Sequence, residues 1–187
     1  GGIARHRGWL LGDDPALGQP TQKHFETQVY DALATFDPGR PVFVESESKR
    51  IGNLQVPEAL LAAMRAAECI RVDTALALRV EVLLDDYAHW RNDPESLNQR
   101  LVPLTSLHGK ATIARWQQAA LQGDFATFAA DLLATHYDPS YSRSIERNFE
   151  RLPQAPAIAP RTADRAAFAA LAREAIASAA AGISMKG

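Results

Sequence analysis

The sequence predicts an α/β fold in which short parallel strands alternate with helices. The first observation is a short apolar run over residues 41–45, bounded by turn residues, which is typical of a buried strand. The second is an apolar run that begins at Cys69 and is followed by apolar residues at three- and four-residue intervals from Leu76 to Tyr87. Strand, helix, strand and helix at this spacing indicate parallel strands joined by helical crossovers.

The N-terminal part is expected to begin with a loop and a helix. Residues 1–20 are rich in glycine, proline and aspartate, which favour turns and loops. Thr21 stands where a helix N-cap is expected, and apolar residues from Phe25 onward recur at helical spacing to about Thr35. The polar stretch 46–53, which follows the expected strand, is predicted to be a loop.

The second half of the sequence has a helical pattern. Apolar residues recur at helical spacing around Trp116 and again from Phe125, with Gly123 between the two stripes. From residue 151 the chain is punctuated by prolines and is then rich in alanine, which indicates a linker and a weakly packed helix. We therefore expect a truncated α/β domain over 1–110, a helical extension over 111–150 and a tail over 151–187.

Composition limits the class of protein. The chain has 187 residues, 47% hydrophobic and 22% charged, which suits one ordinary globular domain with a tail. There is no apolar run of about 18 residues, so we expect no membrane span. The single cysteine, Cys69, excludes an internal disulfide framework and an all-cysteine metal cage, and it is compatible with a cytoplasmic protein. The five histidines show no metal-binding spacing, so no metal site is expected.

The charge of the chain leaves its partner open. The net charge of −2 is not that of a strongly basic nucleic-acid binder. Sixteen of the 20 basic residues are arginine, whose planar guanidinium suits phosphate recognition. A GC-rich genome would produce the same bias, since the chain is also rich in alanine. The class of partner must therefore be inferred from local motifs.

The residues just after the first expected strand are candidates for an anion site. Glu45 ends that strand, and ligands of open α/β sheets bind beyond the carboxyl ends of the strands. Lys49 and Arg50, a few residues later, could clamp a phosphate. The alternative is that all three are solvated surface charges. A second candidate group consists of His6, Arg7 and Gly8, because glycine allows close approach of an anion to the backbone. The alternative for this group is a flexible terminus.

The phosphate-cradling loop of nucleotide-binding folds is not found in the sequence. That loop needs the pattern GxxxxGK[ST], and Gly109-Lys110 has Leu104 and Ala111 where the pattern requires glycine and serine or threonine. The fold class we predict is therefore α/β, a partial P-loop NTPase-like parallel sheet with a mainly helical C-terminal extension.

Several stretches, in this order, resemble the tRNA 2-selenouridine synthase family, from about residue 4 to residue 150. They are Ala4–Gly8 (ARHRG), Gly18–Glu26 (GQPTQKHFE), Val44–Gly52 (VESESKRIG), Arg79–Tyr87 (RVEVLLDDY) and His136–Tyr141 (HYDPSY). The resemblance implies an N-terminal rhodanese-like domain with a catalytic cysteine, followed by a P-loop domain. It also implies replacement of sulfur by selenium in the 2-thiouridine at the tRNA wobble position. Selenium comes from selenophosphate, and the reaction passes through a geranylated intermediate made from geranyl diphosphate.

This sequence departs from the family pattern. It contains no rhodanese-like domain, first P-loop strand or phosphate loop, and Trp9 stands where the family usually has serine. We therefore expect a fragment or a shortened relative that covers the later part of the P-loop domain and is inactive alone. Because its sheet would have an unpaired edge, we also expect homo-oligomers.

The resemblance implies roles for individual residues. Glu45 would be the catalytic group, orienting a water, a metal or a basic partner. Contacts to diphosphate or to the tRNA backbone would come from His6, Arg7, Gly8, Lys49, Arg50 and Arg79. Contacts to tRNA would come from Gln19, Gln22, Lys23, Tyr137, Tyr141 and Arg143. The two tyrosines would stack on an unpaired anticodon base, although packing under a turn is an equally good reading.

The expected partners follow from this resemblance. They are tRNA, selenophosphate and geranyl diphosphate as co-substrates, and an enzyme that supplies selenophosphate; no resident cofactor is expected, and a role for Mg²⁺ stays open. Two alternatives remain: a remnant of a small P-loop kinase or nucleotidase, and a non-catalytic helical interaction module.

Overall fold

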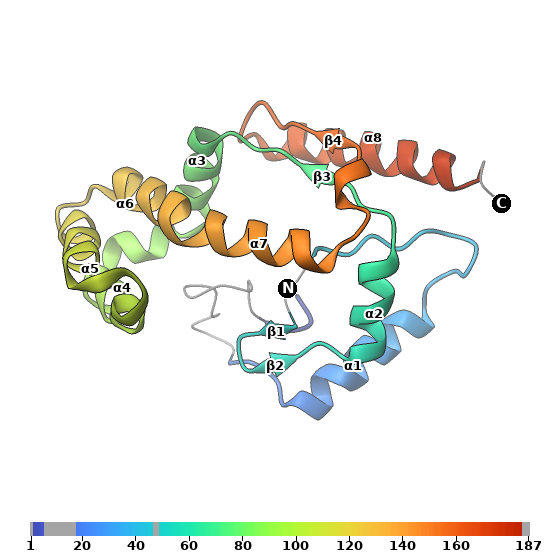
Figure 1. The fold of residues 1–187 in the computed structure, drawn as a ribbon, viewed down its shortest axis with the longest axis horizontal. Coiled ribbons are helices and arrows are strands. Elements are labelled where there is room, and N and C mark those ends of the chain that lie inside the picture. The colour runs from blue at the N-terminus through green and yellow to red at the C-terminus, as the bar shows by residue number, and fades with distance from the viewer. Residues whose placement is uncertain (1, 6–17, 47–48, 185–187) are drawn as a thin grey trace. The chain divides into compact units, whose positions relative to one another are not determined.

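The computed structural model of the chain describes residues 2–5, 18–46 and 49–184, with side chains up to residue 178. This part is mostly helical and carries two small sheets of two strands each (Figure 1). In chain order the regular elements are α1 (Gln22–Ala34), β1 (Arg50–Ile51), β2 (Leu54–Gln55), α2 (Glu58–Ala66), β3 (Arg71–Val72), α3 (Leu76–Asp86), η1 (Ala88–Asn92), α4 (Pro94–Leu101), η2 (Val102–Leu104), α5 (Thr105–Leu121), α6 (Phe125–Leu132), the π-turn η3 (Leu133–Tyr137), α7 (Asp138–Asn148), η4 (Leu152–Gln154), β4 (Ala157–Ile158) and α8 (Arg165–Ser184).

These elements form two compact units. The first unit comprises residues 1–69, 145–155 and 172–187, and the second comprises residues 70–144 and 156–171. Each unit has buried apolar side chains of its own, so each is described separately. None of the described helices is long and apolar enough to span a bilayer.

The first unit packs α1 and α2 around a short hairpin. The N-cap predicted at Thr21 is confirmed, because its side chain accepts a hydrogen bond from the His24 amide at 3.3 Å. The strands β1 and β2 pair antiparallel, with Arg50 opposite Gln55. Strand β1 lies within the stretch 46–53, where the sequence predicts a loop. The buried residues that hold these elements together are Ala4, Phe25, Ile51, Leu54, Val56 and Leu61.

The prediction of a buried strand over residues 41–45 is wrong. Residues 41–46 have no regular secondary structure, and Val42, Phe43 and Val44 are 47%, 43% and 55% exposed. An apolar β-branched run becomes a buried strand only when a neighbour pairs with its backbone and covers its side chains. No strand of the described residues pairs with this run, so Glu45 does not end a strand.

The second unit contains the parallel strand pair. The strand predicted from Cys69 is confirmed in part as β3, which pairs in parallel with β4, Arg71 lying opposite Ala157. Its partner comes from the segment expected to be a linker. Because each strand is two residues long, the fold shown is mostly helical with small sheets, and a larger parallel sheet is not found among the described residues.

A helical core makes up most of the second unit. Helix α5 packs against α4 and α6, and α6 packs against α3 (Figure 1). The largest fully buried side chains of the described part are Leu97, Leu101 and Trp116. The break predicted at Gly123 is confirmed, because its φ is +76° and the side chain of Asp124 caps α6.

Replacing Leu101 tests this core. Leu101 is completely buried, so Leu101→Ala leaves a cavity and is expected to lower the free energy of unfolding by about 2–5 kcal/mol. Leu107→Ala, at a leucine that is 64% exposed, is the matched control and is expected to change stability by less than about 0.5 kcal/mol. Urea denaturation measures the free energy of unfolding of both variants, and equal losses would contradict the burial of Leu101 in the helical core.

Candidate functional site

The two glutamines of the first motif hold the β1–β2 hairpin. The Gln19 side-chain amide donates to the Ile51 carbonyl at 2.8 Å and to the Ala4 carbonyl at 3.4 Å. Its oxygen accepts a hydrogen bond from the Asn53 amide at 2.8 Å. One side chain therefore satisfies backbone groups on both sides of the hairpin turn, which otherwise would rely on water.

Gln22 does the same for the second strand. Its Nε2 donates to the Gln55 carbonyl at 2.9 Å, and its Oε1 accepts from the Gln55 amide at 2.8 Å. This is the pair of bonds that one residue of a neighbouring strand would exchange with Gln55. Its Nε2 also lies 2.7 Å from Glu26 Oε1, one turn further along α1. We call Gln19 and Gln22 together the glutamine clamp.

Gly52 makes room for the glutamine clamp. Its φ is +59°, in the left-handed region that favours glycine. A Cβ atom at this position would lie 2.4 Å from Gln19 Oε1. Any other residue would therefore strain the turn and also push Gln19 away from the hairpin.

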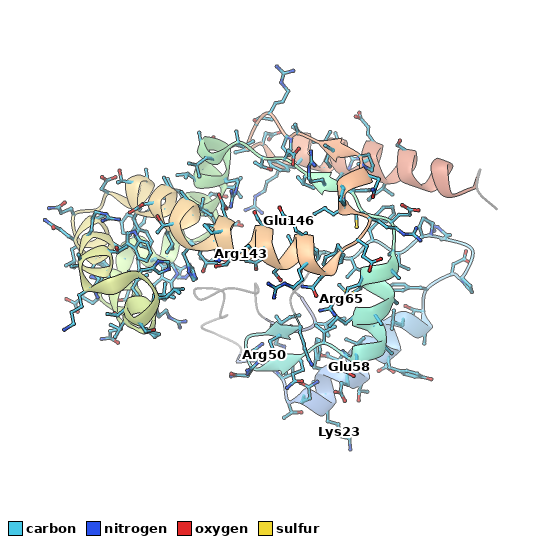
Figure 2. All side chains as sticks on the ribbon, in the orientation of Figure 1. Lys23, Arg50, Glu58, Arg65, Arg143 and Glu146 are labelled. Carbon is cyan, nitrogen blue, oxygen red and sulfur yellow. The ribbon has the colours of Figure 1, made fainter. Side chains whose placement is uncertain are left out.

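The hairpin presents the predicted basic pair. Lys49 and Arg50 stand at its start and are both exposed; Figure 2 marks Arg50 on β1 and Glu58 at the start of α2. The Lys49 carbonyl accepts from the Val56 amide at 2.9 Å, which fixes its backbone. Lys49 Nζ lies 3.4 Å from Glu58 Oε1, with the two side chains 55% and 87% exposed. A pair this exposed is weak, so an anion can compete for the lysine.

The other residues of the first unit that were predicted to form a binding site are either exposed or outside the residues that the structure describes. Glu45 is in the exposed irregular segment ahead of Lys49. Lys23 is exposed and projects outward from α1 (Figure 2). Three further candidates, His6, Arg7 and Gly8, lie outside the described residues.

The second unit holds a continuous row of rings, which we call the ring series. Its centroids are 5.2 Å apart between Trp116 and His108, 5.0 Å between His108 and His136, 4.9 Å between His136 and Tyr137, and 6.3 Å between Tyr137 and Tyr141. Trp116 and Tyr137 are buried, at 1% and 8% exposure, whereas Tyr141 is 38% exposed. The ring series thus runs from the core to the surface.

Two arginines are hydrogen-bonded to residues close in sequence to Tyr141, the exposed end of this series. Arg143 Nε donates to the Pro139 carbonyl at 2.7 Å, one turn earlier in α7. Arg79, on α3, forms a two-bond ion pair with Asp138, at 3.0 and 2.6 Å. The two side chains are 33% and 40% exposed. Arg79, which was predicted to contact phosphate, therefore already has a carboxylate partner.

Other reactive groups have ordinary surroundings. Burial, and then the neighbouring Glu68, raise the pKa of the Cys69 thiol, so it stays protonated at neutral pH. Within the described residues no three or more histidine, cysteine, aspartate or glutamate side chains are grouped to hold a metal ion.

Sequence reasoning missed two features of these sites. The first is that the glutamine amides bind the hairpin backbone. The second is the direct contact of His108 with His136, which are 28 residues apart and carry no spacing signal. The signal in the sequence for the irregular helix beside His108 is Gly109, because glycine accommodates the positive φ found there.

Comparison with known proteins gives a family. Residues 1–100 match a family model described as the tRNA 2-selenouridine synthase AAA domain. The tRNA 2-selenouridine synthase of Sulfurovum sp. (strain NBC37-1) is 28% identical over 179 residues, covering 81% of this chain and 49% of the relative. That of Alcanivorax borkumensis is 30% identical over 174 residues, covering 78% and 48%. That of Nitrosomonas eutropha is 40% identical over 91 residues, covering 46% and 22%.

The chain spans about half the length, or less, of these curated relatives. No solved structure matches it.

Gln22→Ala tests the glutamine clamp. The variant leaves both backbone groups of Gln55 without their partner, so hydrogen exchange at the Gln55 amide is expected to accelerate and unfolding free energy to fall by about 1–3 kcal/mol. Lys23→Ala, which alters the next side chain on α1, is the matched control and should leave both measurements unchanged. Equal exchange rates in the two variants would mean that Gln22 does not hold the strand.

Proposed function

Because this chain belongs to the tRNA 2-selenouridine synthase family, we propose that it contributes tRNA and diphosphate binding to the replacement of sulfur by selenium in wobble 2-thiouridine. Selenophosphate supplies the selenium. In the first step of this proposal the thiocarbonyl sulfur attacks geranyl diphosphate, a sulfur–carbon bond forms, the carbon–oxygen bond breaks and diphosphate leaves. The match covers 49% of the Sulfurovum relative, so the proposal assigns this chain binding and not the whole reaction.

The observation that carries the proposal is the hairpin that presents Lys49 and Arg50. Backbone held by the glutamine clamp keeps the two cations at a defined place on the surface. Positive side chains stabilise a diphosphate leaving group as its charge develops, and they also contact the phosphates of an RNA backbone. Glu45, in the segment just before the hairpin, stays the proposed catalytic group that orients a water or a basic partner.

The exposed end of the ring series supports a second contact in the same proposal. Tyr141 is exposed enough to stack on an unpaired base, whereas Tyr137 is buried and supports it from below. The anchored Arg143 stands two residues further along α7 and would contact a neighbouring phosphate. Arg79 would bind phosphate only by giving up Asp138.

Gln19, Gln22 and Lys23 have different parts in this proposal. The two glutamines act on RNA only through the hairpin, because their amides are bound to its backbone. Lys23 remains a direct candidate, since its side chain is exposed. His6, Arg7 and Gly8 keep their proposed anion contacts.

Binding of an anticodon stem-loop tests the basic pair. We expect the loop with 2-thiouridine to bind the chain more tightly than the unmodified loop, and affinity to fall between about 50 mM and about 200 mM salt. Lys49→Ala with Arg50→Ala should weaken binding and reduce the salt slope by about 1–2. Removal of two other exposed cations, Lys110→Ala with Arg173→Ala, is the matched control.

Several outcomes of that titration would count against the proposal. Equal losses of affinity in the two double variants would mean that binding depends on overall positive charge and not on the position of Lys49 and Arg50 on the hairpin. No binding at either salt concentration would exclude tRNA recognition by this chain. Turnover of ATP, measured in parallel, would favour the alternative of a small kinase or nucleotidase.

Tyr141 gives an independent test of base stacking. Tyr141→Ala is expected to weaken binding of the stem-loop by about 1–3 kcal/mol, whereas Tyr141→Phe should keep most of the affinity because the ring remains. Tyr30→Ala, at a tyrosine on α1 that is 73% exposed, controls for loss of an exposed ring. Fluorescence anisotropy measures all three variants. If Tyr141→Ala binds as the wild type does, the two tyrosines only pack under the turn.

A further inference from the structure

Two histidines sit at the two main irregularities of the helices in the second unit. His108 directly precedes Gly109, whose φ of 79° and ψ of 160° interrupt α5. His136 lies in the π-turn Leu133–Tyr137, which joins α6 to α7. Irregular turns inside helices are frequent at functional positions, because they cost stability that regular helix would keep. Neither irregularity has a part in the proposed binding of diphosphate.

The two imidazoles meet directly. His108 Nε2 lies 3.0 Å from His136 Nδ1, and the ring planes are nearly perpendicular, at 87°. At this distance one nitrogen carries a proton and donates it, and the other accepts with its lone pair. A first added proton can enter on an outer nitrogen and leave the bond intact. A second proton places an N–H on both facing nitrogens and replaces attraction by repulsion between two cations.

The surroundings offer the pair little compensation for charge. Burial, and then the charge of His108, lower the pKa of His136 below its ordinary value of 6.5. Of the titratable groups nearby, Tyr137 contacts the pair directly, with its ring centroid 4.9 Å from that of His136. Others on the neighbouring elements include Arg79 on α3, Arg115 on α5, Asp131 on α6, and Asp138 and Tyr141 on α7.

Both carboxylates of that group are already paired. Asp138 is bound to Arg79, and Asp131 accepts from Arg115 at 2.7 Å and from Trp116 Nε1 at 2.8 Å. Burial alone would raise the pKa of Asp131, but hydrogen bonds from Arg115, Trp116 and Thr135 outweigh it and lower that pKa. Asp131 therefore stays ionised and engaged while the histidines titrate.

We propose that the His108–His136 hydrogen bond is a proton-operated latch that fastens the π-turn and the start of α7 to α5, and that double protonation of the pair releases this junction. The latch stabilises the junction above the ordinary histidine pKa of 6.5, and this stabilisation is lost as pH falls through the lowered pKa of His136. The junction continues into Tyr137 and Tyr141, so loss of this bond loosens one of the two attachments of the outer end of the ring series and leaves the Arg79–Asp138 pair as the other. Any effect on RNA binding rests on the proposed function, but the latch itself does not.

Titration of the wild-type chain tests the latch without RNA. The imidazole C–H signals of the His108–His136 pair in NMR spectra are expected to titrate in coupled steps, with the step of His136 below its ordinary pKa of 6.5. Two independent, unshifted curves for His108 and His136 would overturn the proposal.

Hydrogen exchange then tests the release of the junction. After correction for intrinsic exchange, protection of amides over 133–141 in the wild type is expected to fall about fivefold to tenfold from about pH 7.5 to about pH 5, as for the loss of one hydrogen bond. The double variant His108→Gln with His136→Asn places amide atoms where the facing nitrogens were and cannot titrate, so its protection should stay constant. His89→Gln is the matched control and should behave as the wild type.

The outcomes separate the latch from the binding proposal. A wild type with constant protection, or a double variant that loses protection as the wild type does, would overturn the latch. If the double variant does not fold, the wild-type titration and exchange decide alone. Failure of stem-loop binding with a normal coupled titration would overturn the proposed function and leave the latch standing.

Discussion

The satisfaction of backbone hydrogen bonds by side-chain amides is the constraint on which the first unit depends. A hairpin of two-residue strands exposes more N–H and C=O groups than it pairs, and such an isolated ribbon is barely stable in water. Gln19 and Gln22 supply the missing partners at the turn and at the outer strand. The turn needs glycine at position 52, because a side chain there would occupy the place of Gln19. These bonds, together with the strand pairing and the buried Ile51 and Leu54, hold the backbone that carries the basic pair.

The second unit is held at one stretch by polar side-chain contacts between segments that are distant in the sequence. The stretch from the π-turn to the start of α7 is held at His136 by His108 and at Asp138 by Arg79. These two contacts join the stretch to α5 and α3, on either side of the buried Tyr137. Motifs that resemble family signatures thus meet one another in the folded chain, and a structural role explains part of their presence. The substrate contacts that we propose must come from the atoms that remain exposed, as on Tyr141.

Local features were predictable from the sequence, and features that need a distant partner were not. The cap at Thr21, the stripe through Trp116 and the break at Gly123 depend on neighbours within a turn or two, so the pattern of residues suffices. The run 41–45 has the composition of a strand but lacks a pairing neighbour in the described residues, and β4 pairs although its sequence indicated a linker. Likewise, the sequence does not show whether a glutamine amide binds RNA or the backbone of a hairpin, so the partners of Gln19 and Gln22 could be identified only from the structure.

The exposed apolar stretch Val42–Val44 has a consequence for handling the molecule. Short segments with high β-propensity and no charge are the ones that stack into cross-β fibrils when water and neighbouring chains can reach them. Pro41 before this stretch has no amide proton to donate, and Glu45 after it introduces a charge that repels identical copies in register. These two flanking residues are of the kind that act as gatekeepers beside such a run, so we expect their replacement to make the chain aggregate more readily at high concentration.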